Sequence, residues 1–386
     1  MVHAPQLLRS DEEQLLADTC RRYALNELLP DFMRWRSEPY PRTKIEALAD
    51  LGVLGLAIPE EFGGSGASLR SLGVAAEELS RGDINISYFI QLSAIAAGLL
   101  GASGDPELQG RWLPGVATGE LVFSFALTEP HVGSDAAKLT TRAVRDGSDW
   151  LITGEKASIT FAGQADACIA FARSGGDGAR GISMFLVPLD APGVERTVYD
   201  SAGAKLTERG SLHFDEVRVP ASHQLGAEGV GFVAAMEAFD FNRAVIALAC
   251  VGAAQQSLDE TIEHVKTRES FGKPLARHEG VAFQIAEHLA QIHAARLVAY
   301  QTLDLADAGR PHTTEAAMCK WLGPKHAAEA IHACGILHGW AGWGHELPFN
   351  QRMNDVMGLE IGDGTPEIMK AVIAREVMGR EFASYK

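Results

Sequence analysis

A run of short, β-rich segments separated by glycine turns interrupts a chain whose pattern is otherwise helical. These segments lie between residues 122 and 219, and turn signals such as Asp146-Gly147 separate them. On both sides of the run, apolar residues recur at helical spacing. The sequence of 386 residues therefore predicts an α+β fold in three blocks. These are an N-terminal helical domain (1–120), a middle antiparallel β domain (121–230) and a C-terminal helical domain (231–386).

The predicted helices have recognisable ends. Ser10 and Glu13 form a capping-box pattern at the start of the first helix, which is expected to run to Leu29 and stop at Pro30. An apolar stripe over 283–300 is wide enough for packing in a helix bundle. The helices expected in the C-terminal block cover 236–268, 281–308, 314–334 and 366–379.

Composition excludes several classes of function. A formal charge of −16 argues against nucleic-acid binding, because neutralising phosphates requires a basic surface. No apolar run approaches the roughly 20 residues of a membrane-spanning helix, and the first nine residues lack the apolar core of a signal peptide. We therefore expect a cytoplasmic protein without a membrane partner. The five cysteines are scattered and form no C-x-x-C, so neither a disulfide framework nor a metal site is predicted.

The stretch 359–368 is predicted to be a loop that leads into the last helix. Asp363 lies between two glycines, which let another molecule approach its backbone closely. Thr365 is a suitable N-cap, Pro366 suits the first helical position, and Glu367 falls in the first turn. Taken alone, an aspartate in such a turn is more often an ordinary turn residue than a functional one. A functional role for Asp363 therefore depends on motifs elsewhere in the chain.

Two motifs in the middle block are specific when taken together. Residues 125–135 contain T-E-P-x-x-G-S-D, and residues 154–160 contain G-x-K-x-x-I-T. In this combination the chain resembles the acyl-CoA dehydrogenase family. Further family-like motifs follow the same order along nearly the whole chain, at 51–64, 214–220, 268–274 and 363–368.

The resemblance implies the family's fold and cofactor. The fold would comprise an N-terminal helical domain, a middle antiparallel β-barrel or sandwich, and a C-terminal four-helix bundle. The cofactor would be FAD, with the middle-domain residues facing the isoalloxazine and the residues of the R-x-x-F-G-K segment holding the ADP part across a subunit contact. The cofactor-binding residues carried over are Phe125, Leu127, Thr128, Gly133, Ser134, Ser158, Ile159, Thr160, Arg268, Ser270, Phe271, His278, Gly339, Thr365 and Glu367.

The resemblance also implies residues that bind an acyl-CoA substrate. Ser134 and Gly364 match such positions, and so do Asp240 and Arg243. The last two stand at i and i+3 on a predicted helix, so they could equally pair with each other. For these two residues both interpretations stay open.

The family's mechanism assigns the remaining roles. The carboxylate of the E-G-T motif, Asp363 here, would take the α-proton of the acyl-CoA, and FAD N5 would accept the β-hydride. The thioester carbonyl would be held by the backbone N–H of Asp363 and a ribityl hydroxyl, which together act as an oxyanion hole. The resemblance further implies an electron-transfer flavoprotein as electron acceptor and a homotetramer.

The chain departs from the family pattern at several positions. Asp363 replaces the usual glutamate, and Gly362 stands where a tyrosine-type residue is common. Ser158 replaces an aromatic residue, and Ile336 and Trp340 lie in the segment where the family has Q-x-x-G-G. We hypothesise that the first two departures widen the pocket for a bulky, branched or ring acyl group, as in the cyclohexanecarboxyl-CoA dehydrogenase-like branch with an aspartate base.

Three other functions remain open from the sequence. Nitroalkane oxidases share this fold and also use an aspartate base, although retention of Ser134, Asp240 and Arg243 favours an acyl-CoA. A flavin monooxygenase of the same fold often lacks a base at this position, so Asp363 counts against it. A relative recruited to bind DNA or another protein is disfavoured by the acidic charge and the intact motifs.

Overall fold

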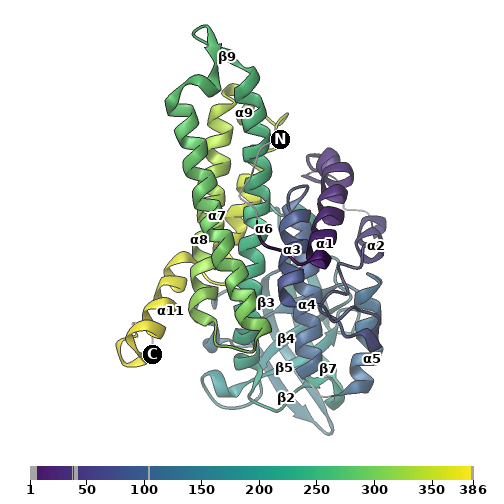
Figure 1. Ribbon diagram of the computed structural model, residues 1–386. Coiled ribbons are helices and arrows are strands. Elements are labelled where there is room, and N and C mark those ends of the chain that lie inside the picture. The colour runs from purple at the N-terminus through teal and green to yellow at the C-terminus, as the bar shows by residue number, and fades with distance from the viewer. Residues whose placement is uncertain (1–6, 37, 39–41, 103–104, 384–386) are drawn as a thin grey trace. The chain divides into compact units, whose positions relative to one another are not determined.

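The computed structural model describes residues 7–36, 38, 42–102 and 105–383 (Figure 1). These residues form two compact units. The helical unit comprises the described parts of Met1–Pro39, Leu69–Ser87 and Asp240–Lys386, and the sheet unit comprises those of Tyr40–Ser68 and Tyr88–Phe239.

The sheet unit is built around one sheet of eight strands among the described residues, in the order β6-β7-β3-β2-β4-β5-β8 with β1 paired to β4. The pairs β1–β4 and β2–β4 are parallel, so the expectation of a purely antiparallel domain was wrong at these two contacts. The connection from β1 to β4 carries β2 and β3, and such a long crossover allows parallel pairing. The strands are β1 Phe123–Ala126, β2 Arg142–Asp146, β3 Asp149–Ile159, β4 Ala167–Arg173, β5 Ile182–Pro188, β6 Val194–Val198, β7 Gly210–Val219 and β8 Gln224–Leu225.

The centre of this sheet is covered on both faces. Strands β4 and β5 are buried along almost their whole length, as their continuous apolar sequences predict. The helices of the unit are α2 Arg42–Asp50, α4 Ser87–Ala102 and α5 Pro106–Ala117. Within the described residues, the helical stretch Ile84–Ala102 is long and apolar enough to cross a membrane, but most of it is buried inside the protein, as in a core helix.

The helical unit contains a four-helix bundle formed by α6, α7, α8 and α10, so its fourth helix is not the one expected at 366–379. In Figure 1 the first three run side by side, and the β9–β10 hairpin joins α6 to α7 at one end. Gly323 permits close packing of α8 on α6, because a Cβ there would lie 2.6 Å from the Cβ of Ala247. The elements of the unit are α1 Asp11–Tyr23, α3 Leu69–Leu79, α6 Gly231–Thr267 from Asp240 onward, β9 Glu269–Ser270, β10 Lys273–Pro274, α7 Glu279–Asp307, α8 Thr313–Leu337, α9 Trp340–Trp343, α10 Phe349–Ile361 and α11 Pro366–Met378.

The structure confirms some predicted helix ends and corrects others. The capping box of Ser10 and Glu13 is formed, but α1 ends at Tyr23 and continues as one π-helical turn. Helix α10 was missed, and its last turn includes residues 359–361, which were predicted to be loop. The apolar stripe of α7 is only partly core, since Phe283 is 65% exposed. The N-terminal helices divide between the units: α3 packs on α7 in the helical unit, and α1 packs on α3.

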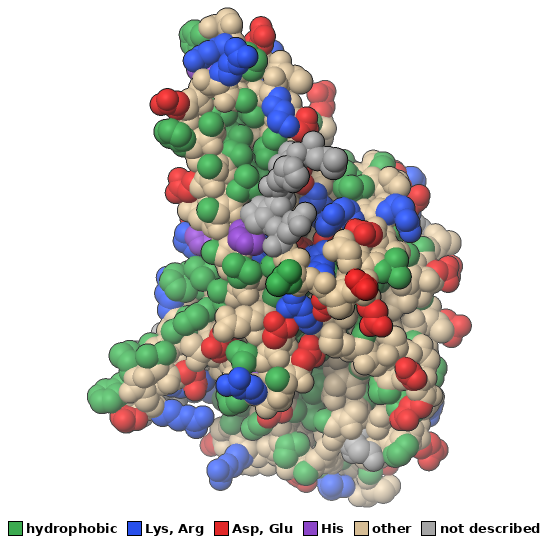
Figure 2. Space-filling model, viewed as in Figure 1, with side chains coloured by type: hydrophobic (Ala, Val, Ile, Leu, Met, Phe, Trp, Pro, Cys, Tyr) green, Lys and Arg blue, Asp and Glu red, His purple; other side chains and the backbone are tan. Residues whose placement is uncertain are grey.

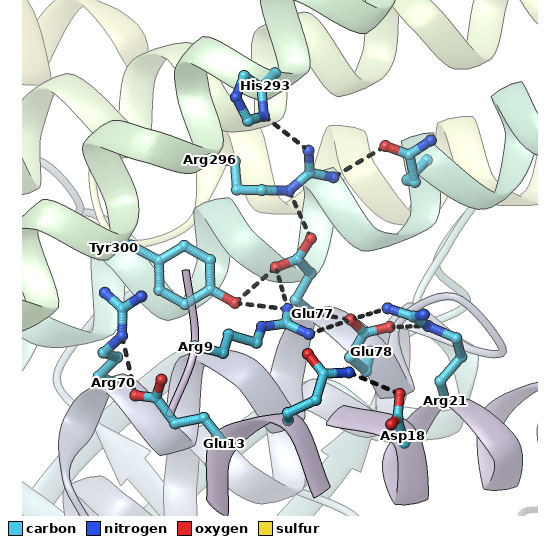
Figure 3. A network of polar contacts seen from close by, with 12 residues as sticks. Arg9, Glu13, Asp18, Arg21, Arg70, Glu77, Glu78, His293, Arg296 and Tyr300 are labelled. Atoms are coloured by element: carbon cyan, nitrogen blue, oxygen red, sulfur yellow. Dashed lines mark hydrogen bonds and ion pairs between the residues drawn. The ribbon is translucent and has the colours of Figure 1, made fainter. Parts of the chain in front are cut away.

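A buried network of charges joins the N-terminal and C-terminal helices of the helical unit (Figure 3). The carboxylate of Glu77 on α3 accepts hydrogen bonds from Arg296 Nε and Tyr300 Oη of α7, both at 2.7 Å. Its neighbour Glu78 accepts from Arg9 at 3.1 Å and from Arg21 at 2.6 Å. Burial would raise the pKa of Glu77, but the nearby Arg296 outweighs it and lowers that pKa. The network therefore holds the ionised carboxylate of Glu77 inside the unit.

Candidate active site

Asp363 lies on a turn between α10 and α11 in the helical unit. Gly362 ends α10, and Thr365 caps α11 by accepting a hydrogen bond from the backbone N–H of Ile368, as the sequence predicts. Asp363 itself has a φ of +56°, in the left-handed region that few residues other than glycine adopt. The next residue, Gly364, is favoured as glycine because its φ of +109° is a backbone conformation that residues with a Cβ rarely adopt. A non-glycine residue held in this conformation is typical of functional sites.

Three side chains from two helices hold this turn. Asn242 Nδ2 of α6 donates to Oδ2 of Asp363 at 2.7 Å, and Arg243 Nε donates to its backbone oxygen at 3.2 Å. Lys320 Nζ of α8 donates to the backbone oxygens of Glu360 at 3.3 Å and Gly364 at 3.1 Å. The turn is therefore held on both sides of Asp363.

Lys320 brings a buried positive charge to the site. Its side chain is 1% exposed. Burial lowers the pKa of Lys320 to about 8, while attraction to Asp363 acts in the opposite direction. At neutral pH the lysine is therefore mostly an ammonium that attracts the carboxylate.

Asp240 and Arg243 form the ion pair that their spacing allowed. Arg243 Nη1 lies 2.7 Å from Asp240 Oδ1, and Thr313 Oγ1 donates to the other carboxylate oxygen at 2.6 Å. Both charged side chains are largely buried. The contact of Arg243 with the Asp363 turn supports a positioning role for Arg243, and contact of either residue with a substrate stays a prediction.

The backbone N–H of Asp363 is free to bind a ligand. Within the described part of the chain it donates to no acceptor. The turn thus offers a carboxylate and a nearby amide donor on one residue. A base and a donor for a carbonyl oxygen are the two groups that proton abstraction next to a carbonyl requires.

In the sheet unit the structure brings the two middle-domain motifs together. The backbone N–H of Ala157 donates to the carbonyl of Thr128 at 2.9 Å, and Ser124 Oγ donates to the carbonyl of Thr160 at 2.9 Å. Phe125, Thr128 and Thr160 are half-buried, and Gly133, Ser134 and Ser158 are exposed. The side chains of Leu127 and Ile159 are buried, so only their backbones could contact a ligand.

The resemblance places the isoalloxazine of FAD at this surface, and this placement stays a prediction. Among the described residues, neither the hydroxyl of Thr128 nor that of Thr160 has a hydrogen-bond partner. Both are available to the polar edge of a ring system, beside the aromatic face of Phe125. Ser158 has a φ of +59°, and its carbonyl accepts from Arg209 at 3.0 Å.

Two other motif residues, Glu129 and Lys156, are buried and hold the loop that forms this surface. Lys156 Nζ lies 2.9 Å from Glu129 Oε1 and donates to the carbonyl of Leu127 at 3.0 Å, and both charged side chains are buried. Glu129 also accepts from the backbone N–H groups of Thr140 and Thr141. Glu129 and Lys156 therefore shape the loop rather than face a ligand.

The Glu129 pair makes stability depend on pH. Burial would raise the pKa of Glu129, but Lys156 and the hydrogen bonds outweigh it and lower this pKa from 4.5 to about 2. A lowered folded-state pKa stabilises the fold above the unfolded value, and the contribution, about 3 kcal/mol, is lost as pH falls from 4.5 toward 2. We expect Glu129→Gln to lower the free energy of unfolding most at pH 7 and progressively less toward pH 3. Urea unfolding of wild type and variant across this range measures the difference. A difference that does not change with pH would contradict the lowered pKa of Glu129.

The residues predicted to hold the ADP part lie together on the hairpin of the helical unit. Arg268 precedes β9, and His278 Nε2 lies 3.2 Å from the carbonyl oxygen of Ser270. Phe271 is 95% exposed at the hairpin turn, with a φ of +52°. Figure 2 shows Lys and Arg side chains gathered at the end that Figure 1 labels β9, as binding a phosphate would require. Gly339 follows the end of α8 with a φ of +64°.

Two residues of the Asp363 site were missed by sequence reasoning. Asn242 is adjacent in sequence to Arg243, which the resemblance placed near the substrate, and this adjacency could have indicated that Asn242 lies near the site. Lys320 stands in the apolar run of α8, where a lone charge signals a buried partner. In contrast, Glu367 is exposed beside Lys370. No group of three or more potential metal ligands occurs among the described residues.

The helical, β and helical order of the domains agrees with the resemblance to a family of flavin-dependent oxidoreductases. Models of the N-terminal, middle and C-terminal domains of acyl-CoA dehydrogenases match residues 10–120, 124–217 and 229–378. The chain therefore belongs to the acyl-CoA dehydrogenase family, and FAD is its cofactor.

Relatives cover almost the whole chain. It is 32% identical to the short-chain specific acyl-CoA dehydrogenase of Rattus norvegicus mitochondria, over 95% of this chain and 90% of the relative. It is 36% identical to (2S)-methylsuccinyl-CoA dehydrogenase of Cereibacter sphaeroides, over 95% of this chain and 70% of the relative. The structure of a glutaryl-CoA dehydrogenase from Mycobacterium smegmatis in complex with FADH2 superposes with a TM-score of 0.92 at 29% identity, covering 98% of this chain and 97% of that one.

Proposed function

We propose that the protein oxidises an acyl-CoA to the 2-enoyl-CoA, with Asp363 taking the proton from Cα. The observation that carries this proposal is the held carboxylate. Asp363 is fixed in a left-handed turn by Asn242, Arg243 and Lys320, and its own N–H is left without a partner. An ordinary turn aspartate would not need two buried cations beside it.

The chain's residues supply proton transfer and charge stabilisation. The free N–H of Asp363 polarises the thioester carbonyl, which makes the α-proton more acidic. Asp363 accepts that proton. Lys320 and Arg243 hold the turn, so the carboxylate keeps its position as its charge is neutralised. Bound FAD would supply the acceptor for the hydride that leaves Cβ.

The same turn supports a bulky acyl group as substrate. Gly362 has a φ of −61°, which any residue can adopt, and an added Cβ would make only an ordinary 3.5 Å contact with the carbonyl of Gly358. Glycine is therefore not required there by the fold. Together with the shorter side chain of Asp363, it leaves room beside the reacting carbons for a branched or ring acyl group.

Anaerobic bleaching of the bound flavin tests this function. Butyryl-CoA, isobutyryl-CoA, cyclohexanecarboxyl-CoA and nitroethane should be compared on the purified holoenzyme. We expect the branched or ring thioesters to bleach the flavin faster than butyryl-CoA, and nitroethane to leave it unchanged. Preference for butyryl-CoA would remove the bulky-substrate proposal, and bleaching by nitroethane alone would replace the function with that of a nitroalkane oxidase.

Gly362→Leu provides the matched control. The backbone conformation at this position accepts leucine, so folding and FAD content should persist. We expect the variant to lose most of its rate with cyclohexanecarboxyl-CoA and to keep most of its rate with butyryl-CoA. Equal losses on both thioesters would show that Gly362 does not set the size of the pocket.

We also propose an electron-transfer flavoprotein as electron acceptor, a homotetramer and a cytoplasmic location. The exposed apolar side chains of Phe283, Leu297, Ile336 and Trp340 support self-association of the helical unit. Sedimentation of the holoenzyme as a monomer would contradict the tetramer. Reoxidation of the reduced enzyme by oxygen alone would contradict the proposed acceptor.

A further inference from the structure

We propose that Asn242 is a positioning residue that holds one oxygen of the Asp363 carboxylate and leaves the other to take the substrate proton. The inference rests on the proposed role of Asp363 as the base. It concerns a residue that shares no motif with the turn and lies 121 positions away in the chain.

The geometry of the contact is specific to one carboxylate oxygen. Asn242 Nδ2 lies 2.7 Å from Asp363 Oδ2, at the short end of N–H···O distances and typical of a bond to a charged acceptor. Oδ1 of Asp363 has no protein partner among the described residues. An amide that binds one oxygen fixes the rotation of the carboxylate and directs the free oxygen away from itself.

A short base makes this restraint necessary. Aspartate has one methylene fewer than glutamate, so a carboxylate that rotates freely would sample few productive positions. Misplacement of a catalytic group by about 1 Å can cost on the order of 10²-fold in rate. Arg243 and Lys320 act on backbone oxygens of the turn, and within the described residues Asn242 is the side chain that donates to the carboxylate itself.

The amide of Asn242 is dispensable for the fold. Its side chain is 3% exposed, and its own Oδ1 is buried without a partner. A buried acceptor without a donor costs free energy, so a leucine of similar size would remove that cost. Asn242→Leu is therefore expected to fold, bind FAD and keep its thermal midpoint.

The test compares Asn242→Leu with wild type and with Gln256→Leu. Gln256 lies on the same helix, is also buried, donates to Glu260 at 3.1 Å and has an unpartnered Oε1. Gln256→Leu also removes a buried side-chain amide from this helix, but at a position that does not contact Asp363. The substrate is the thioester among butyryl-CoA, isobutyryl-CoA and cyclohexanecarboxyl-CoA that bleaches the wild-type flavin fastest, in protonated form and with deuterium at Cα.

We expect Asn242→Leu to lose about 10- to 100-fold in the rate of flavin reduction with little change in KM. The isotope effect of deuterium at Cα should increase, because proton transfer becomes the slower step. Gln256→Leu should keep the wild-type rate and isotope effect. A purely structural role of Asn242 would lower the thermal midpoint or the FAD content and would leave the isotope effect unchanged.

The outcomes separate this inference from the proposed function. If no thioester bleaches the wild-type flavin, the proposed function fails and this inference fails with it. If wild type is reduced and Asn242→Leu matches it in rate and isotope effect, only the inference is overturned. If Asn242→Leu loses FAD, Asn242→Ser, whose side chain is too short for the contact, must show the slower rate and larger isotope effect, and its failure to do so overturns the inference.

Discussion

Replacing Asp363 with asparagine is expected to slow reduction of the bound flavin by acyl-CoA on the order of 10³-fold, the range found when a positioned general base is removed. The amide of asparagine cannot accept the α-proton. Asparagine also tolerates the left-handed φ of +56° as well as aspartate does. The variant should therefore fold, bind FAD and differ in proton transfer. Anaerobic stopped-flow absorbance of the flavin measures the rate.

The first control for this variant is the state of its bound flavin and of its fold. Unchanged absorbance, FAD content and thermal midpoint would show that the loss of rate lies in the chemistry. A matched Asp240→Asn variant removes a carboxylate that pairs with Arg243 and Thr313 on α6 and α8. It should lose less rate than Asp363→Asn. A rate for Asp363→Asn within a few-fold of wild type would assign the base elsewhere.

Replacing Arg296 with methionine is expected to destabilise the protein by about 3–5 kcal/mol, the cost of leaving a buried charge without its partner. Arg296 Nε lies 2.7 Å from Glu77 Oε1, and both side chains are almost fully buried. Methionine keeps most of the volume and removes the charge. Glu77 then retains the hydroxyl of Tyr300 and the more distant Arg9 at 3.7 Å. Urea unfolding of the holoprotein measures the change as a lower midpoint.

Arg34→Met is the control for charge removal at the surface. Arg34 lies 2.6 Å from Glu38, and both side chains are about half exposed. Exposed pairs contribute roughly 0–1 kcal/mol, so the midpoint should change little. Equal effects of the two variants would show that the buried network does not stabilise the association of α3 with α7.

The sequence predicted the strands of the sheet unit closely because they are short β-rich runs between turn signals. Residues 182–188 and 194–198 form β5 and β6 as predicted. The parallel pairing of β1 with β4 was missed, because pairing depends on tertiary contacts and leaves no local signal. Helix α10 was missed because its polar residues face other buried groups. Arg352, for example, binds Glu260 at 2.7 Å.

The motif order pointed to Asp363 as the proposed base, but it gave no sign of the side chains that hold its turn. Thr365 and Pro366 start α11 as their residue types predict, since capping is a local property. The contacts of Asn242 and Lys320 with the turn join residues far apart in sequence, and only the packing of α6, α8 and α10 brings them together. The sequence also did not predict which apolar side chains are exposed to solvent. The stripe on α7 has core periodicity, yet Phe283 faces solvent in the single chain.

The central claim is that Asp363 removes the α-proton of an acyl-CoA, and exchange of that proton with solvent tests it most directly. The holoenzyme is incubated anaerobically in deuterated water with the thioester that bleaches its flavin, and deuterium in the recovered thioester is measured by mass spectrometry. Wild type is expected to introduce deuterium at Cα, whereas Asp363→Asn with full FAD content is expected to introduce none. Exchange at the wild-type rate by Asp363→Asn would contradict the claim.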